Sequence, residues 1–109
     1  MGTGTVEDGK TIAIISYFSI IGFIIALLMN NDKKNDFAAF HIRQSLGLIG
    51  LWVAVWGILY FVSIPFLGWI LQLGLFVMWI LAFIGAIQGE KKPVPVFGTQ
   101  FQEWFKGIG

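Results

Sequence analysis

Residues 44–89 read QSLGLIGLWVAVWGILYFVSIPFLGWILQLGLFVMWILAFIGAIQG, and Tyr60 carries the only ionisable side chain among these 46 residues. A helix that crosses a membrane needs about 20 apolar residues, because each residue rises about 1.5 Å and the hydrocarbon layer is about 30 Å thick. The run is therefore long enough for two spanning helices. Pro65 disfavours helical geometry at the residue before it and lacks a backbone donor, so it predicts a tight turn. We expect helices over about 36–62 and 67–89.

The composition of the whole chain indicates the same class of protein. Of its 109 residues, 57% are hydrophobic and 12% are charged, against about 25% charged in soluble domains. A soluble domain of this size has a large surface to cover with polar side chains. We expect a single membrane domain over residues 1–109. The net charge of +1 gives no basic face for nucleic acid, and the chain has no cysteine.

The N-terminal apolar segment, residues 11–29, has 19 uncharged residues and predicts a third spanning helix. A cleavable signal peptide is the competing interpretation. Such a peptide would have a shorter apolar region, a basic segment before it and a small-x-small site after it. Glu7 and Asp8 precede this segment instead, which favours a retained helix. The predicted fold class is an all-α membrane protein with three transmembrane helices and a short C-terminal interfacial amphipathic helix.

Three spans would place the two termini on opposite faces of the membrane. The loop 30–43 and the tail 90–109 would then share a face that carries six lysine or arginine residues, and the other face would carry only Lys10. Under the positive-inside rule, the face with six cations is cytoplasmic. We therefore expect a multi-pass protein of the cell inner membrane with its N-terminus outside and its C-terminus in the cytoplasm.

The second predicted helix has a stripe of small residues. At 100° per residue, its members fall within an arc of about 80° together with Arg43. A small-residue stripe lets two helix backbones approach closely in a membrane. His41 and Ser45 lie on the opposite side of the helix. The helix-packing stripe consists of Ala39, Gly47, Gly50, Ala54 and Gly57.

A polar motif, Phe40-His41-Ile42-Arg43-Gln44, precedes the apolar run and is the candidate anchor or interaction site. Arg43 has two open interpretations: it reaches lipid phosphate at the surface, or its planar fork binds a fixed acceptor. Candidate acceptors are helix-end carbonyls near Gly89, the Glu90 carboxylate or a partner protein. We expect His41 and Gln44 to lie at the headgroup level. No catalytic, cofactor-binding or metal site is expected, because no second histidine and no cysteine could complete one.

The C-terminal tail predicts a short amphipathic helix over about 99–106. Phe97, Phe101, Trp104 and Phe105 follow helical spacing, and Thr99 with Gln102 fits a capping box. A frayed tail is the alternative, because two turns of isolated helix are marginally stable.

The motif Phe40-His41-Ile42-Arg43-Gln44-Ser45-Leu46 resembles the Phe-His-x-Arg-Gln signature of the Tic20-like family of small membrane proteins. The turn 64–69 and the tail 92–98 are also similar to that family, and the resemblance covers about residues 10–106. It implies a bacterial inner-membrane relative of a chloroplast import component, linked to protein translocation or membrane assembly. The plant members are described with four spans, and this chain has room for three.

We weigh three classes of function. An integral membrane scaffold or accessory subunit fits the small-residue stripes and the absence of paired catalytic groups. The alternative is a small oligomeric channel or transporter, although no charged residue lies at mid-membrane depth. An enzyme is disfavoured, since general acid–base chemistry needs paired titratable groups in one place. The expected partners are the lipid bilayer and other membrane proteins or a second copy. Neither a nucleic acid nor an identifiable small-molecule substrate is expected.

Overall fold

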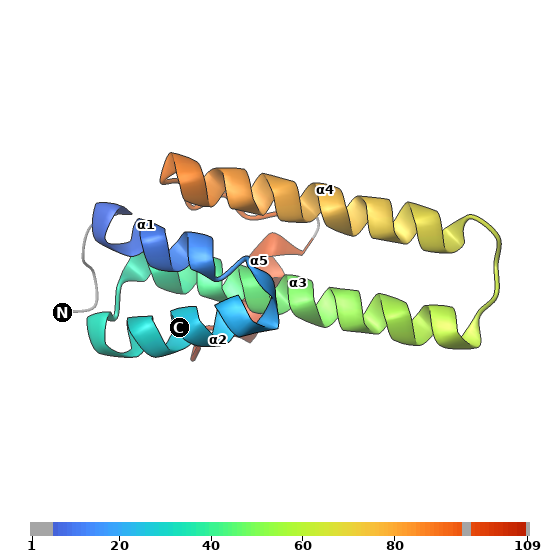
Figure 1. Ribbon diagram of the computed structural model, residues 1–109, viewed down its shortest axis with the longest axis horizontal. Coiled ribbons are helices and arrows are strands. Elements are labelled where there is room, and N and C mark those ends of the chain that lie inside the picture. The colour runs from blue at the N-terminus through green and yellow to red at the C-terminus, as the bar shows by residue number, and fades with distance from the viewer. Residues whose placement is uncertain (1–5, 95–96, 109) are drawn as a thin grey trace.

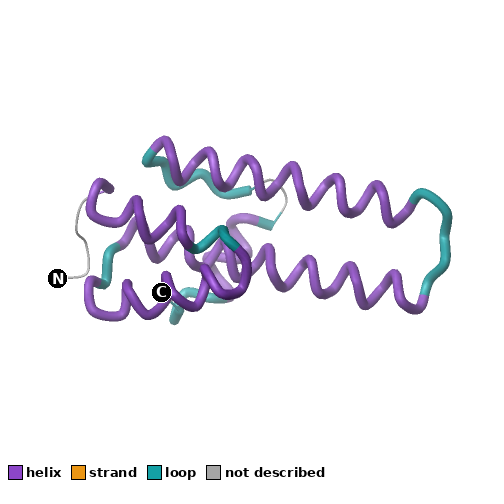
Figure 2. The backbone as a smooth tube through the Cα atoms, viewed as in Figure 1, coloured by secondary structure: helices purple, strands orange, loops and turns teal. Residues whose placement is uncertain are grey.

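The computed structural model describes residues 6–94 and 97–108, and these residues form helices and connecting segments without any strand. Figure 1 shows the arrangement, and Figure 2 separates the helices from the loops. The fold is all-helical, as the sequence predicted. In chain order the helices are α1 (Val6–Ile15), α2 (Ser19–Lys33), α3 (Asp36–Phe61), α4 (Leu67–Gln88) and α5 (Gly98–Trp104).

The long hairpin of α3 and α4 is the frame of the molecule. Each helix begins where the sequence predicted and ends one residue earlier. Both helices are long and apolar enough to cross a membrane. The chain reverses between them around Pro65, where Phe66 adopts a left-handed conformation with φ of 69°. α3 and α4 run antiparallel along the long axis of the molecule (Figure 1).

The expectation of one spanning helix over 11–29 is wrong. The segment forms two helices, α1 with 10 residues and α2 with 15 residues, and both are shorter than the roughly 20 residues that a span needs. The helices fold back on each other as a short hairpin at one end of the molecule (Figure 1). Among the described residues, therefore, two helices qualify as spans, and not three.

The reversal between α1 and α2 depends on Ser19 and Gly22. Ser19 adopts φ of 80°, a left-handed conformation that turns the chain back sharply. A Cβ at Gly22 would collide with the carbonyl oxygen of Ile15, so the two helices approach at backbone contact distance. Ala26 and Asn30 continue the same face and are fully buried. Ala26 packs against α1 and against Ala38 and Ile42 of α3, so this face joins the hairpin to α3.

The start of α1 lies at the same end of the molecule as the start of α3 and the end of α4. A Cβ at Gly9 would meet the side chain of Asn35, and a Cβ at Gly89 would lie 2.8 Å from Cγ1 of Val6. The described beginning of the chain and the tail therefore share one end, which we call the charged end. The expected placement of the two termini on opposite faces does not follow from this fold, because α1 and α2 cross half of the molecule and return.

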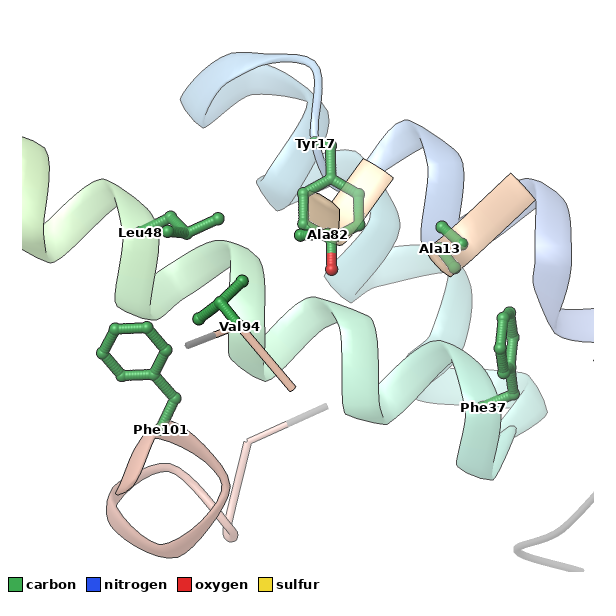
Figure 3. Close-up of a cluster of buried hydrophobic side chains, with 8 residues drawn as sticks. Ala13, Tyr17, Phe37, Leu48, Ala82, Val94 and Phe101 are labelled. Carbon is green, nitrogen blue, oxygen red and sulfur yellow. The ribbon is translucent and has the colours of Figure 1, made fainter. Parts of the chain in front are cut away.

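The buried apolar residues gather where the hairpin, the frame and the tail meet. Figure 3 shows Ala13 and Tyr17 from the first segment, Leu48 from α3, Val94 from the tail and Phe101 from α5 around one core. A second cluster joins α1, α2 and the first turns of α3. The opposite half of α3 and α4 carries exposed apolar side chains. The packing is thus concentrated in the charged half.

Candidate functional site

The break between α1 and α2 frees backbone carbonyls that have no partner within a helix. The Ser45 hydroxyl donates to the carbonyl oxygen of Ser16, and the Trp79 indole N–H donates to the carbonyl oxygen of Tyr17 at 2.9 Å. An unpaired backbone group in an apolar environment costs several kcal/mol, so a broken helix needs such partners. Side chains of α3 and α4 therefore stabilise the break.

His41 connects the break to the chain that follows α4. Its Nε2 lies 2.9 Å from the carbonyl oxygen of Glu90, which can only accept, so Nε2 carries the hydrogen and donates. Its Nδ1 then accepts from the Tyr17 hydroxyl at 2.5 Å. The His41 side chain is fully buried and is bonded within the fold. The rings of Phe37 and Phe40 meet it edge-on, with centroids 4.8 and 5.1 Å away.

Gln44 makes three hydrogen bonds from one side chain. Its Nε2 donates to the Tyr17 hydroxyl and to the Lys92 carbonyl oxygen, each at 3.1 Å, and its Oε1 accepts from the Val94 N–H at 2.9 Å. Gln44 is fully buried among segments of its own chain, so its side chain contacts protein groups. We call Tyr17, His41, Gln44 and Ser45 the polar junction. It joins the break, α3 and the chain after α4.

Arg43 has fixed acceptors, but not the expected ones. Its Nε donates to the carbonyl oxygen of Ile108 at 2.8 Å, and Nη2 donates to that of Lys106 at 3.0 Å. The carbonyl oxygen of Phe40 accepts from Gln102 Nε2 at 2.9 Å. The planar fork of arginine suits two acceptors at once. The motif thus binds the tail through its backbone as well as its side chains.

The C-terminal helix α5 packs on α3 at Gly47. A Cβ at Gly47 would overlap the ring of Phe101, whose side chain is buried. The expected capping box is wrong: the N-cap of α5 is Phe97, no side chain caps the helix, and Gln102 is used on α3 instead. Of the apolar tail residues, Phe101 is buried on the packed face of α5, whereas Trp104 is 63% exposed, so the predicted apolar face is packed only in part.

The small-residue stripe of α3 divides into two parts. Ala39 and Gly47 are buried in the charged half, whereas Gly50, Ala54 and Gly57 are exposed. A Cβ at Gly50 or Gly57 would have no described atom within 4 Å. The sequence predicted close packing along the whole stripe. Within this chain, only the first part of the stripe, Ala39 and Gly47, is packed.

The hydrogen bonds of the polar junction are complete. Among the described residues, every buried side-chain nitrogen or oxygen has a partner. Both ring nitrogens of His41 are engaged. Within that same part of the chain, no three side chains of histidine, cysteine, aspartate or glutamate gather as a metal site would require. The arrangement is suited to holding segments of the chain together, because buried and satisfied polar groups specify one packing.

The structure thus defines a helical protein with two helices fit to cross a membrane and a short hairpin fastened beside them. The chain belongs to the magnetosome magnetite crystal formation protein family (MamF/MmsF), whose model matches residues 8–100. It is similar to two membrane proteins of Methanocaldococcus jannaschii. UPF0132 membrane protein MJ1527 is 30% identical over 97% of this chain and 75% of that protein. UPF0132 membrane protein MJ1443 is 34% identical over 84% of this chain and 83% of that protein. No solved structure matches the chain.

The resemblance to the Tic20-like family is wrong. The family model and both relatives place the chain in a different family of membrane proteins. The error came from a short motif, and the structure explains what that motif does here. Phe40, His41, Arg43 and Gln44 hold the tail and the break against α3. The same residue types can meet this packing need without any role in protein translocation.

Proposed function

We propose that this chain is an integral membrane scaffold or accessory subunit with its charged end in the cytoplasm. Two spanning helices would anchor it, and the hairpin, the chain after α4 and α5 would form a firmly packed platform. The observation that carries the proposal is the polar junction. Its side chains are buried and bonded to the chain's own segments, so they stabilise a shape and leave no group for a substrate.

The charge distribution supports this orientation. All seven lysine and arginine residues lie outside residues 44–89, and the turn between α3 and α4 carries no charged side chain. The contacts of Gly9 and Gly89 bring α1 to the same end as the loop and the tail. Seven cations against none favours a cytoplasmic charged end under the positive-inside rule. The beginning of the described chain would then be cytoplasmic too.

We propose no enzymatic role, because the one histidine has both ring nitrogens bonded within the fold. The family description concerns magnetite crystal formation, and the two relatives are described only as membrane proteins. For this chain we propose only that it holds other membrane proteins, or a second copy of itself, together in the membrane. This proposed role does not require the chain to bind a metal ion.

Photo-crosslinking in cells tests the scaffold proposal. A photoreactive amino acid is placed at Asp32, in the charged half, or at Ser63, in the turn between α3 and α4; both side chains are exposed. We expect discrete protein adducts from position 32 and none from position 63. The purified chain in lipid vesicles should not accelerate the flux of ions or small solutes. If the purified chain accelerates solute flux and no protein adducts form in cells, the scaffold proposal is overturned in favour of the channel or transporter alternative.

A further inference from the structure

A groove of about 970 Å³ lies between α3 and α4, and Ser19, Ile20 and Ile21 of the α1–α2 hairpin line part of it. Trp52 lines it from α3, and Phe76 and Trp79 line it from α4. Tyr17 closes its inner end, and Trp69 stands at its outer end. Figure 1 shows why the groove exists: beyond the break, α3 and α4 continue without a third helix beside them.

The length of the groove matches one leaflet of a bilayer. Its lining on α4 extends from Gly68 to Trp79. Eleven residues of helix rise about 16 Å. The hydrocarbon layer is about 30 Å thick, so the groove covers about half of it. A hydrocarbon chain from the leaflet at the uncharged end would therefore fill the groove along its length.

The lining is suited to an uncharged chain. No residue that lines the groove is charged, and most lining residues are aromatic or aliphatic. The groove is open to its surroundings, since Leu73 is 61% exposed and Phe76 is 57% exposed. In a membrane these side chains meet lipid. An anionic or cationic ligand would find no opposite charge there.

Gln72 adds one polar feature to the outer half of the groove. Its side chain is exposed, and it makes no hydrogen bond with the residues that the structure describes. An amide in an apolar layer gains from any available acceptor or donor. Gln72 lies five residues, about 7.5 Å of helix rise, from the first residue of α4, and a helical side chain tilts toward the N-terminal end of its helix, where the lipid esters lie. An ester carbonyl is an acceptor of the right kind at this level.

We propose that the groove between α3 and α4 binds an acyl chain of one glycerophospholipid, with the Gln72 amide donating to its ester carbonyl. The bound lipid belongs to the leaflet opposite the charged end. It completes the packing of the half of α3 and α4 that no other helix covers. This inference does not depend on the scaffold role.

Native mass spectrometry of the full chain in mild detergent with palmitoyl-oleoyl phosphatidylcholine tests the proposal. We expect one lipid bound to each protein. The double variant Ile49→Phe with Leu73→Phe fills the groove and should lose the lipid. The matched control, Val53→Phe with Ile70→Phe, changes exposed residues outside the lining and should retain it. Equal lipid retention by both double variants would overturn the proposal.

A second pair of variants tests the Gln72 hydrogen bond without filling the groove. Gln72→Leu should raise the dissociation constant of the lipid, measured by titration, about threefold, the value of an average hydrogen bond in a membrane protein. Gln88→Leu removes an exposed amide from the same helix outside the groove and should leave that dissociation constant unchanged. Equal lipid binding by Gln72→Leu and Gln88→Leu would contradict the role of Gln72. A two-chain species without lipid would show that a second copy occupies the groove, and would overturn the proposal.

Discussion

The substitution Gln44→Leu tests the polar junction at its most connected residue. Leucine has a similar volume but can neither donate nor accept a hydrogen bond. The Val94 N–H and the Lys92 carbonyl oxygen lose the partners that lie at 2.9 and 3.1 Å. The Tyr17 hydroxyl keeps its bond to His41. Two backbone groups are therefore left without a side-chain partner in the packed charged half.

The expected loss follows from these two groups. A buried group without its partner costs about 1–3 kcal/mol, and the Lys92 carbonyl is only partly buried. We therefore expect Gln44→Leu to lower the free energy of unfolding by about 2–4 kcal/mol. The chain after α4 should separate from the bundle more often, because Gln44 holds it at two points.

Two measurements check this prediction. Unfolding in mild detergent by added dodecyl sulfate, followed by tryptophan fluorescence, gives the change in stability. Limited digestion with trypsin should cut after Lys91 faster in the variant than in the unsubstituted chain. Gln88→Leu is the control, because this exposed amide has no hydrogen bond among the described residues. Stability within about 0.5 kcal/mol of the unsubstituted chain, the usual range for surface changes, would refute the role of the junction.

Three further predictions concern separate contacts. Gly47→Leu should displace Phe101 and destabilise the protein by about 2 kcal/mol or more, whereas Gly57→Leu should change thermal stability little; equal effects would contradict the observed packing of α5. Ser45→Ala and Trp79→Phe should each speed amide hydrogen exchange in residues 16–18, whose N–H groups are bonded at the break, because each variant leaves a carbonyl of the break unpaired; unchanged exchange would show that the break holds without them. Arg43→Lys should speed exchange at residues 105–108 nearly as much as Arg43→Ala, since one ammonium cannot reproduce the fork; exchange like that of the unsubstituted chain in Arg43→Lys would mean that charge alone suffices.

The frame of the fold was predictable because its signals are local. The uncharged run and Pro65 decide α3, the turn and α4 within a few residues of each position. Gly89 likewise ends α4 by adopting φ of 75°, with the Glu90 N–H donating to the Gly85 carbonyl oxygen at 2.8 Å. This is the usual glycine-terminated helix end. Each of these features follows from the residue types themselves.

The break in the first apolar segment could not be predicted in the same way. Residues 11–29 contain neither proline nor a charge, so length and hydropathy indicate a continuous helix. The carbonyls freed at Ser16 and Tyr17 find partners on Ser45 and Trp79, far along the chain. Only the folded structure brings these donors to the break. The weak sequence signal was the close spacing of Ser16, Tyr17 and Ser19 inside an apolar run.

The polar motif is visible in the sequence, but the partners of its side chains are not, because they too lie far along the chain. The sequence singled out His41, Arg43 and Gln44 as polar residues at the edge of an apolar run. Apart from the Tyr17 hydroxyl, their partners are backbone groups of the tail, which carry no sequence signature. A backbone carbonyl looks the same at every residue. The sequence therefore shows which residues seek partners but not which segment supplies them.

We infer that two helices span the membrane and that the first apolar segment returns to the end where it began. Single cysteines replace Glu7, Ser63 or Glu103, all exposed, in this cysteine-free chain. An impermeant thiol reagent is then applied to intact cells, and again to opened membranes. We expect only the cysteine at position 63 to react in intact cells and all three to react in opened membranes. Labelling of positions 7 and 63 together in intact cells, with position 103 protected, would contradict it and restore a three-span topology.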